Sequence, residues 1–307
     1  MKPWRFLDTG ALPGAVNMAI DEAILTLHLR GQSPPTLRLY RWNPPALSLG
    51  RLQRGHGFDL DACRRRGFDV VQRPSGGKAV LHLGDLTYAV IAGVADGIPA
   101  MVRTAYTLIC QGLLAAFRLM EIEATLGAEA RPSAGSDLCF LHAGAGAIVL
   151  GNRKFVGSAQ AWRGSSMLQH GAILLEPQIE ALLDVQSAAG VDRSRARDVL
   201  KARMTSLREI LGFVPEHEAL AQAIRMGMGQ VLKASFVEGP LTFEELSLAQ
   251  QITGQEIRLQ KVLVAQPRAA EPIGDRPCLH LPRQSREAGC PTARSACVRF
   301  TTRGYAT

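Results

Sequence analysis

The 307-residue sequence predicts an α+β fold with a mixed, mainly antiparallel sheet flanked by helices. Three observations support this class. Short apolar or alternating segments bounded by Gly and Pro follow an early amphipathic helix. A long apolar helical segment then separates them from a second group of strand-like segments. Beyond Pro177 the apolar spacing is helical. Strands and helices are therefore grouped rather than strictly alternating.

The first half of the chain predicts three helices and five strands. Apolar residues at helical spacing, among them Val16, Ile20 and Leu27, predict a helix over 15–30. Shorter and longer helical patterns cover 60–66 and 100–120. The expected strands are TLRLYRW, ALSLGR, FDVVQR, KAVLH and LTYAVIAG, in that order.

The second half predicts a hairpin followed by helices. The segments GAIVL and KFVGSAQAW flank Gly151-Asn152, a pair suited to a tight turn, and MLQHGAILLE forms the next strand. Ser194 is expected to be the N-cap of the second of the later helices. Those helices are predicted over 179–185, 194–211, 216–232 and 243–252.

Charge and composition argue against membrane or nucleic-acid binding. The net charge is +8, but residues 261–307 carry eight Lys or Arg and three Asp or Glu, so the other 260 residues carry only +3. No uncharged apolar run approaches the roughly 18 residues of a membrane span. The N-terminus lacks the apolar core of a signal peptide. We expect a cytoplasmic protein.

The six cysteines form no CxxC pair, which gives no support to a structural zinc site, and we predict no metal. A reducing cytoplasm also disfavours disulfides, so each cysteine is considered as a thiol.

Three segments place polar or small residues where plain core strands would have apolar ones. The first is Arg73-Pro74-Ser75-Gly76-Gly77-Lys78 with His82 after it, where a Gly-Gly pair lets backbone N–H groups approach an anion or carbonyl. The second combines Lys154 with Gly157-Ser158-Ala159, a small-residue stretch against which an elongated apolar ligand fits. The third is His170-Gly171. Each also has a structural interpretation: a charged hairpin turn, a solvated lysine and a hydrogen-bonded strand histidine.

Taken in order, the segments NMAIDEAIL, PTLRLYRWNPPALSLGRLQ, VVQRPSGGKAVLH, LTYAV, GNRKFVGSAQ and LQHGAILL resemble the biotin/lipoate protein ligase and octanoyltransferase superfamily. The resemblance covers residues 4–178, and a weaker similarity extends to about residue 251. It implies a sheet that holds a tunnel for a medium-length acyl chain. We expect a catalytic domain over 1–235 and a C-terminal helical extension over 236–260. The resemblance does not cover residues 261–307, which are rich in Pro, Arg, Ser and Gly and show no periodicity, and which we expect to form an irregular, mobile tail.

The resemblance also implies roles for individual residues. Arg73, Ser75, Gly76, Gly77, Lys78 and His82 match the acyl-binding loop and the histidine after it, and Gly157, Ser158, Ala159, His170 and Gly171 match the strands that line and close the tunnel. Lys154 matches the lysine that contacts the acyl carbonyl. Cys139-Phe140 resembles the nucleophile segment of the cysteine-dependent octanoyltransferases.

Cys139 is therefore the candidate nucleophile, and Lys154 is the group expected to favour its thiolate and to stabilise the oxyanion. No cofactor is required by this route. The second transfer needs a base for the acceptor amine, for which His82 is one candidate. Two departures from the family stand out: Leu83 replaces the acid that follows this histidine, with Asp85 the next acidic residue, and the loop after Phe140 differs from the usual sequence.

The resemblance implies transfer of octanoyl from acyl carrier protein to a lysine of a lipoyl-type acceptor domain, such as glycine cleavage H protein or a 2-oxoacid dehydrogenase E2. Two alternatives stay open: an ATP-dependent lipoate–protein ligase, and a non-catalytic acyl-binding module. Both protein partners tend to be acidic, so Arg51 or Arg73 is expected to dock them. We expect a monomer.

Overall fold

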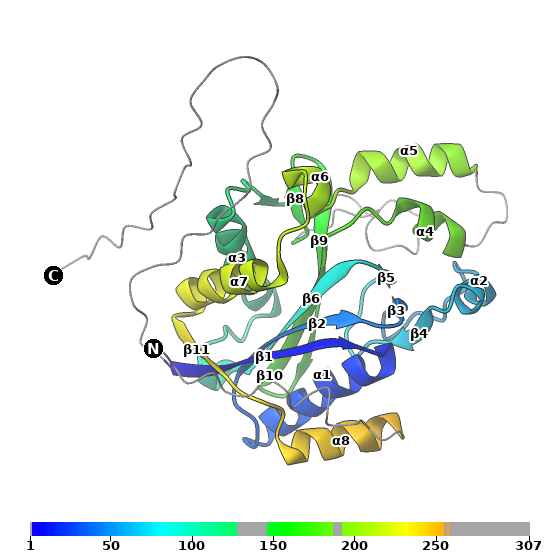
Figure 1. Cartoon of the computed structure of the whole chain (residues 1–307). Helices are drawn as coiled ribbons and strands as arrows, with labels where there is room; N and C mark the ends of the chain where they lie inside the picture. The colour runs from blue at the N-terminus through cyan, green and yellow to red at the C-terminus, as the bar shows by residue number, and fades with distance from the viewer. Residues whose placement is uncertain (1, 128–145, 187–191, 255–256, 258–307) are drawn as a thin grey trace, which may run out of the picture. The chain divides into compact units, whose positions relative to one another are not determined.

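A computed structural model describes residues 2–127, 146–186, 192–254 and 257 of the chain. An eight-stranded sheet lies at the centre of these residues (Figure 1). From edge to edge its strands are β11 (Ala234–Glu238), β1 (Lys2–Leu12), β2 (Thr36–Trp42), β6 (Asp85–Gly93), β10 (Ser166–Leu174), β9 (Arg153–Arg163), β8 (Ile148–Leu150) and β7 (Thr125–Leu126). Strand β1 is parallel to β11 and β2, and the other neighbouring pairs are antiparallel. The predicted fold class is confirmed.

A second sheet of three strands lies in the order β4–β3–β5. Its strands are β3 (Ala46–Leu49), β4 (Asp69–Gln72) and β5 (Val80–His82). The glycine-rich segment 73–78 connects β4 to β5, so this small sheet carries one of the three polar segments of the sequence.

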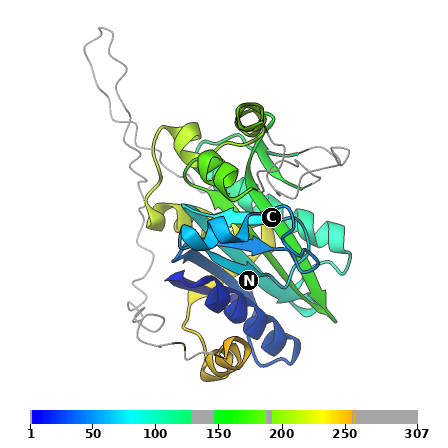
Figure 2. The same cartoon turned by 90° about the vertical axis from the view of Figure 1, so that its right-hand side faces the viewer.

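Helices cover both faces of the large sheet (Figures 1 and 2). Because successive side chains of a strand point to opposite faces, Tyr88 and Val90 join one core and Ala89 and Ile91 join another. Helices α3 and α7 pack together over the first core, and α1 and α8 pack together over the second. The helices are α1 (Gly14–Leu29), α2 (Leu60–Arg65), α3 (Val102–Leu119), α4 (Ile179–Val185), α5 (Arg193–Arg203), α6 (Leu207–Leu211), α7 (His217–Leu232) and α8 (Phe243–Thr253), with a 3-10 turn η1 (Val94–Asp96).

A third core joins the small sheet to the large one. Leu47 and Leu81 of the small sheet pack with Ala172 and Leu174 of β10, and α4 adds Leu182. The small sheet is thereby held against the same stretch of β10 that contains His170 and Gly171.

Most predicted elements are present, but one helix prediction is wrong. The pattern over 194–211 forms two helices, α5 and α6, because the chain between them pairs with β9: the Thr205 amide donates to the Lys154 carbonyl oxygen at 3.0 Å. The N-cap of α5 is Asp192 rather than Ser194, since the Asp192 carboxylate accepts from the amides of residues 194 and 195.

The domain boundary predicted at residue 235 falls inside β11, which pairs with β1. Helix α8 lies within the predicted extension 236–260. Residues 261–307 lie outside the described residues, as does Cys139.

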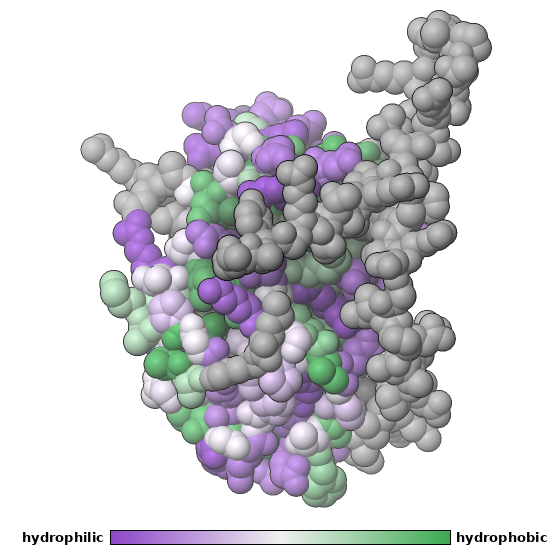
Figure 3. Space-filling view, turned by 90° about the vertical axis from the view of Figure 1, so that its left-hand side faces the viewer, coloured by the Kyte–Doolittle hydropathy of each residue, from purple (hydrophilic) through white to green (hydrophobic). Residues whose placement is uncertain are grey.

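Hydrophilic and hydrophobic residues are interspersed over the face of the molecule drawn in Figure 3. Within the described ranges, no helix has the length and apolar character needed to cross a bilayer.

Candidate active site

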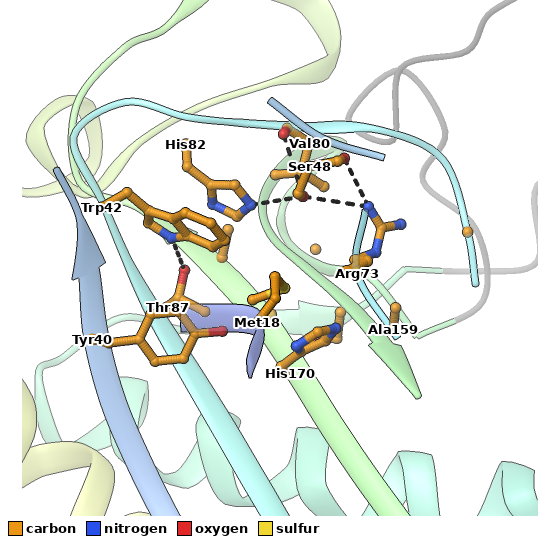
Figure 4. Close-up of a pocket in the computed structure, with 15 residues that line it drawn as sticks. Met18, Tyr40, Trp42, Ser48, Arg73, Val80, His82, Thr87, Ala159 and His170 are labelled. Atoms are coloured by element: carbon orange, nitrogen blue, oxygen red, sulfur yellow. Dashed lines mark hydrogen bonds between the residues drawn. The ribbon is translucent and has the colours of Figure 1, made fainter. Parts of the chain in front are cut away.

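A cavity lies where the large sheet, the small sheet and helix α1 meet (Figure 4). The space between the atoms that line it is about 420 Å³, including the part open to solvent. It is lined by Met18, Tyr40, Trp42, Ser48, Arg73, Gly77, Val80, His82, Thr87, Gly157, Ser158, Ala159, His170, Gly171 and Ala172. Residues from all three polar segments of the sequence thus meet at one cavity.

Small residues on β9 and β10 form one wall of the cavity. The antiparallel register places Gly157 opposite Ala172, Ser158 opposite Gly171 and Ala159 opposite His170. A methyl group on Gly171 would lie 2.6 Å from Ser158 Oγ and 2.8 Å from a Tyr88 ring carbon. The strands therefore pack this closely only because residue 171 has no side chain.

Replacing Gly171 by Ala is expected to destabilise the protein by about 1–3 kcal/mol, because the methyl group overpacks the wall. It should also weaken binding of octanoate, since β9 must move relative to β10. Urea unfolding and calorimetric titration measure the two effects. The control is Gly127→Ala, where the added methyl group meets its nearest neighbour at 3.4 Å. Equal effects of the two variants would contradict the prediction.

Arg73 organises the glycine-rich loop. Its guanidinium donates to the carbonyl oxygens of Ser48, Gly76 and Lys78 at 2.7–3.0 Å, and its Nε donates to Ser75 Oγ at 3.2 Å. The side chain is 5% exposed. This burial contradicts the expectation that Arg73 docks an acidic partner, because its charge is directed into the loop. The corresponding expectation for Arg51, which is exposed, stays a prediction.

The loop also approaches a second backbone segment closely. Gly77 has a φ of +90°, and its carbonyl oxygen lies so close to Gly50 that any side chain on residue 50 would collide with it. Gly77 lines the cavity, whereas Ser75, Gly76 and Lys78 are not among its lining residues.

His170 connects the loop to a buried ion pair. Its Nε2 lies 2.6 Å from Ser75 Oγ and its Nδ1 lies 3.1 Å from Asp21 Oδ2. Asp21 is fully buried, accepts from Tyr40 OH at 2.9 Å and pairs with the equally buried Arg38 at 2.6 Å. Because the carboxylate is the acceptor, we assign the proton of neutral His170 to Nδ1 and let Ser75 donate to Nε2.

The charges in this cluster follow from burial and its compensation. Burial opposes the charged form of Asp21, but the Arg38 guanidinium and the His170 hydrogen bond outweigh it and lower the carboxyl pKa. Burial lowers the pKa of His170, although the hydrogen bond that its Nδ1 donates to Asp21 acts in the other direction. Asp21 is therefore a carboxylate and His170 a neutral imidazole at neutral pH.

His82 has its own carboxylate. Its Nδ1 lies 2.9 Å from Asp85 Oδ2 and its Nε2 lies 2.9 Å from Ser48 Oγ. The ring stacks on Trp42, with centroids 3.9 Å apart and planes 16° apart (Figure 4). Asp85 lies two residues after Leu83 and thus supplies the carboxylate that is absent at position 83.

Lys154 is buried, 3% exposed, near the start of β9, which rules out the solvated-lysine interpretation. It is not among the residues that line the cavity. Its proposed partner, Cys139, falls in the segment 128–145 outside the described residues, so their distance is not defined.

The two cysteines within the described ranges are buried. Burial raises the pKa of the Cys110 thiol to about 12 and also raises that of Cys63. Neither has the exposed, thiolate-favouring surroundings of a nucleophile, and neither lines the cavity.

Several residues of the site were not predicted from the sequence. Asp21 was visible as an acid beside an apolar helical stripe, and Arg38, Tyr40 and Trp42 alternate along one strand, which places them on one face. Asp85 was noted only as a displaced acid. The missed cavity-lining residues are Met18, Tyr40, Trp42, Ser48, Val80, Thr87 and Ala172.

Comparison with known proteins identifies the class. A family model of the lipoyl protein ligase A/B catalytic domain matches residues 13–229. The chain belongs to this family, and the resemblance inferred from the sequence segments is confirmed.

Curated relatives make the assignment more specific. The octanoyltransferase LipM of Kyrpidia tusciae is 38% identical over 261 residues, covering 82% of this chain and 95% of the relative. That of Symbiobacterium thermophilum is 38% identical over 257 residues, covering 81% and 93%.

Solved structures share the fold. A lipoate-protein ligase A bound with ATP has a TM-score of 0.67 at 24% identity and covers 83% of this chain and 95% of its own. A bipartite lipoate protein ligase from Thermoplasma acidophilum, described with its E2 lipoyl domain, has a TM-score of 0.68 at 22% identity, with 88% and 100% covered.

Proposed function

We propose that this protein is an octanoyltransferase of lipoate biosynthesis that moves octanoyl from acyl carrier protein, through a thioester on Cys139, to a lysine of a lipoyl-type acceptor domain. Octanoyltransferase relatives at 38% identity over most of the chain support the enzyme class. The single structural observation that carries the proposal is the cavity, because eight of the eleven residues predicted to bind the acyl group line it.

The cavity suits a medium-length acyl chain. Its wall of small residues on β9 and β10 leaves room for an extended hydrocarbon, and Met18, Val80 and Trp42 supply apolar contacts. Arg73 and Gly77 bring the glycine-rich loop to the cavity, and the Arg73 guanidinium holds the loop backbone in place and adds a positive charge there. This polarity favours an acyl chain that lies in the apolar part with its carbonyl towards the loop.

The chemistry of the proposal needs a thiolate and an oxyanion-stabilising cation. The Cys139 sulfur attacks the octanoyl thioester, and the carrier's thiolate leaves and takes a proton. Lys154 favours the attacking thiolate and donates to the oxyanion of each tetrahedral intermediate. The acceptor amine then displaces the Cys139 thiolate and forms an amide. The first transfer exchanges one thioester for another, and the second converts a thioester to a more stable amide, so ATP is not required.

The acceptor is proposed to be a lipoyl-type domain, on the precedent of the ligase described with its E2 lipoyl domain.

The test is incubation with octanoyl-acyl carrier protein in the absence of ATP, followed by intact-mass measurement. We expect an octanoyl adduct that hydroxylamine removes, present in the wild type and absent in Cys139→Ala. The matched control is Cys110→Ala, which removes a buried thiol and should retain the adduct. Acceptor modification that requires ATP and free octanoate and survives Cys139→Ala would instead identify a ligase. Binding of octanoate without turnover under either condition would identify an acyl-binding module.

A further inference from the structure

Two histidine–aspartate pairs are directed at the same cavity. His82 pairs with Asp85 at 2.9 Å, and His170 pairs with Asp21 at 3.1 Å. In each pair the aspartate binds Nδ1, and a serine hydroxyl lies at Nε2, on Ser48 for His82 and on Ser75 for His170. Both imidazoles line the cavity. Their hydrogen bonds are alike, so what distinguishes them is the charge around each aspartate.

The charge of Asp21 is already compensated. Arg38 donates to Asp21 Oδ1 at 2.6 Å, both side chains are 0% exposed, and Tyr40 OH donates to Oδ2. A proton on His170 would add a second positive charge to a neutral buried ion pair. His170 therefore stays a neutral imidazole and holds the loop through Ser75.

The charge of Asp85 is not compensated in this way. Within the described part of the chain, neither a lysine nor an arginine forms an ion pair with it. His82 and Thr87 both contact its Oδ2, while Oδ1 is buried without a hydrogen-bond partner there. Asp85 Oδ2 thus binds His82 Nδ1, which leaves His82 Nε2 directed at Ser48 Oγ.

Two neighbours fix the positions of His82 and Ser48. The Trp42 ring stacks on His82, and Trp42 is held in that position because its Nε1 donates to Thr87 Oγ1 at 2.8 Å. Arg73 lies on the far side of Ser48 and donates to its carbonyl oxygen and hydroxyl at 3.0 and 3.4 Å. Ser48 Oγ is thereby held 2.9 Å from His82 Nε2.

Resting on the proposed function, we infer that His82 is the base that accepts the proton of the acceptor lysine, with Asp85 as its positioning residue. The Ser48 hydroxyl donates its proton to His82 Nε2. At the same time, Ser48 Oγ takes one proton from the ammonium group of the acceptor lysine, which becomes a neutral amine. The freed amine attacks the Cys139 thioester, and the C–N bond forms as the C–S bond breaks. The second nitrogen-bound proton goes to the departing thiolate, and His82 later returns its proton to solvent.

The test separates the two half-reactions in the variant Asp85→Asn, which preserves the shape of the residue and removes its charge. Octanoylation of the enzyme should change by less than about twofold, while transfer from the isolated octanoyl-enzyme to the lipoyl-type acceptor should slow by roughly 10²-fold. Transfer of the same octanoyl group to hydroxylamine should stay within about twofold of wild type, because hydroxylamine is already unprotonated at neutral pH and needs no base.

Asp96→Asn is the matched control, since Asp96 pairs with His28 at 3.0 Å outside the cavity and His28 also contacts a serine. It should leave all three rates unchanged. A second variant, Ser48→Ala, should likewise slow acceptor transfer while sparing hydroxylamine. Wild-type acceptor transfer by Asp85→Asn, or an equal loss with hydroxylamine, would overturn the assignment of the base. Failure of the wild type to form an octanoyl-enzyme would overturn the proposed function, and the assignment with it.

Discussion

Replacing Arg38 by Met is expected to lower the free energy of unfolding by about 3–5 kcal/mol, because it leaves the buried Asp21 carboxylate without its cation. The guanidinium also donates to the Asn17 carbonyl and side-chain oxygens and to Thr9 Oγ1, so α1, β1 and β2 lose a shared contact. Urea unfolding at pH 7 measures the change.

The control for this variant is Arg197→Met, which breaks the exposed pair with Glu180 on the surface and should leave the unfolding free energy nearly unchanged. Similar losses in the two variants would show that the Asp21–Arg38 pair is not the source of the effect.

The same variant has an expected pH dependence. In the wild type the pKa of Asp21 is lowered, so its contribution to stability is full above the unfolded value of about 3.9 and is lost as the pH falls through the lower native value. In Arg38→Met, burial without the cation raises that pKa, and protonation then relieves the buried charge. The stability deficit should therefore shrink as the pH is lowered towards 4. A deficit that stays constant from pH 7 to pH 4 would contradict this account.

Replacing Lys154 by Met is expected to slow octanoylation of the acceptor by about 10²–10³-fold, the usual loss when an oxyanion donor is removed. Met retains most of the apolar length of this buried side chain, and the backbone hydrogen bond from Thr205 to the Lys154 carbonyl is unaffected. Steady-state rates with octanoyl-acyl carrier protein measure the effect. Lys201→Met, at an exposed position on α5, is the control and should keep the wild-type rate. A Lys154→Met enzyme within twofold of wild type would remove Lys154 from the proposed chemistry.

The local pattern of apolar and turn-forming residues was sufficient to predict most of the secondary structure. Helices α1 and α3 and strand β6 are apolar over most of their length, and Gly151-Asn152 joins β8 to β9 as a two-residue turn. The elements that were not predicted depend on contacts with residues that are distant in the sequence. Strand β11 has mostly exposed side chains and is a strand because it pairs with β1, more than 200 residues away in the sequence.

The break between α5 and α6 has a similar origin. The residues on both sides of it have helical spacing, and the carbonyl oxygen of Lys154, on a strand about 50 residues earlier, accepts from the Thr205 amide at the break. Ser206 also marks the break locally, because it is the N-cap of α6 and its side chain accepts from the Glu209 amide.

The sequence by itself determined which family the chain belongs to and which segments carry the polar residues of the site, because motif residues keep their order and spacing along the chain. Only the tertiary structure decided what the two histidines can do. Asp21 receives Arg38 from a neighbouring strand, whereas Asp85 receives no such cation among the described residues. The physical reason is that the charge state of a buried group depends on which groups surround it in space, and folding, rather than sequence spacing, brings those groups together.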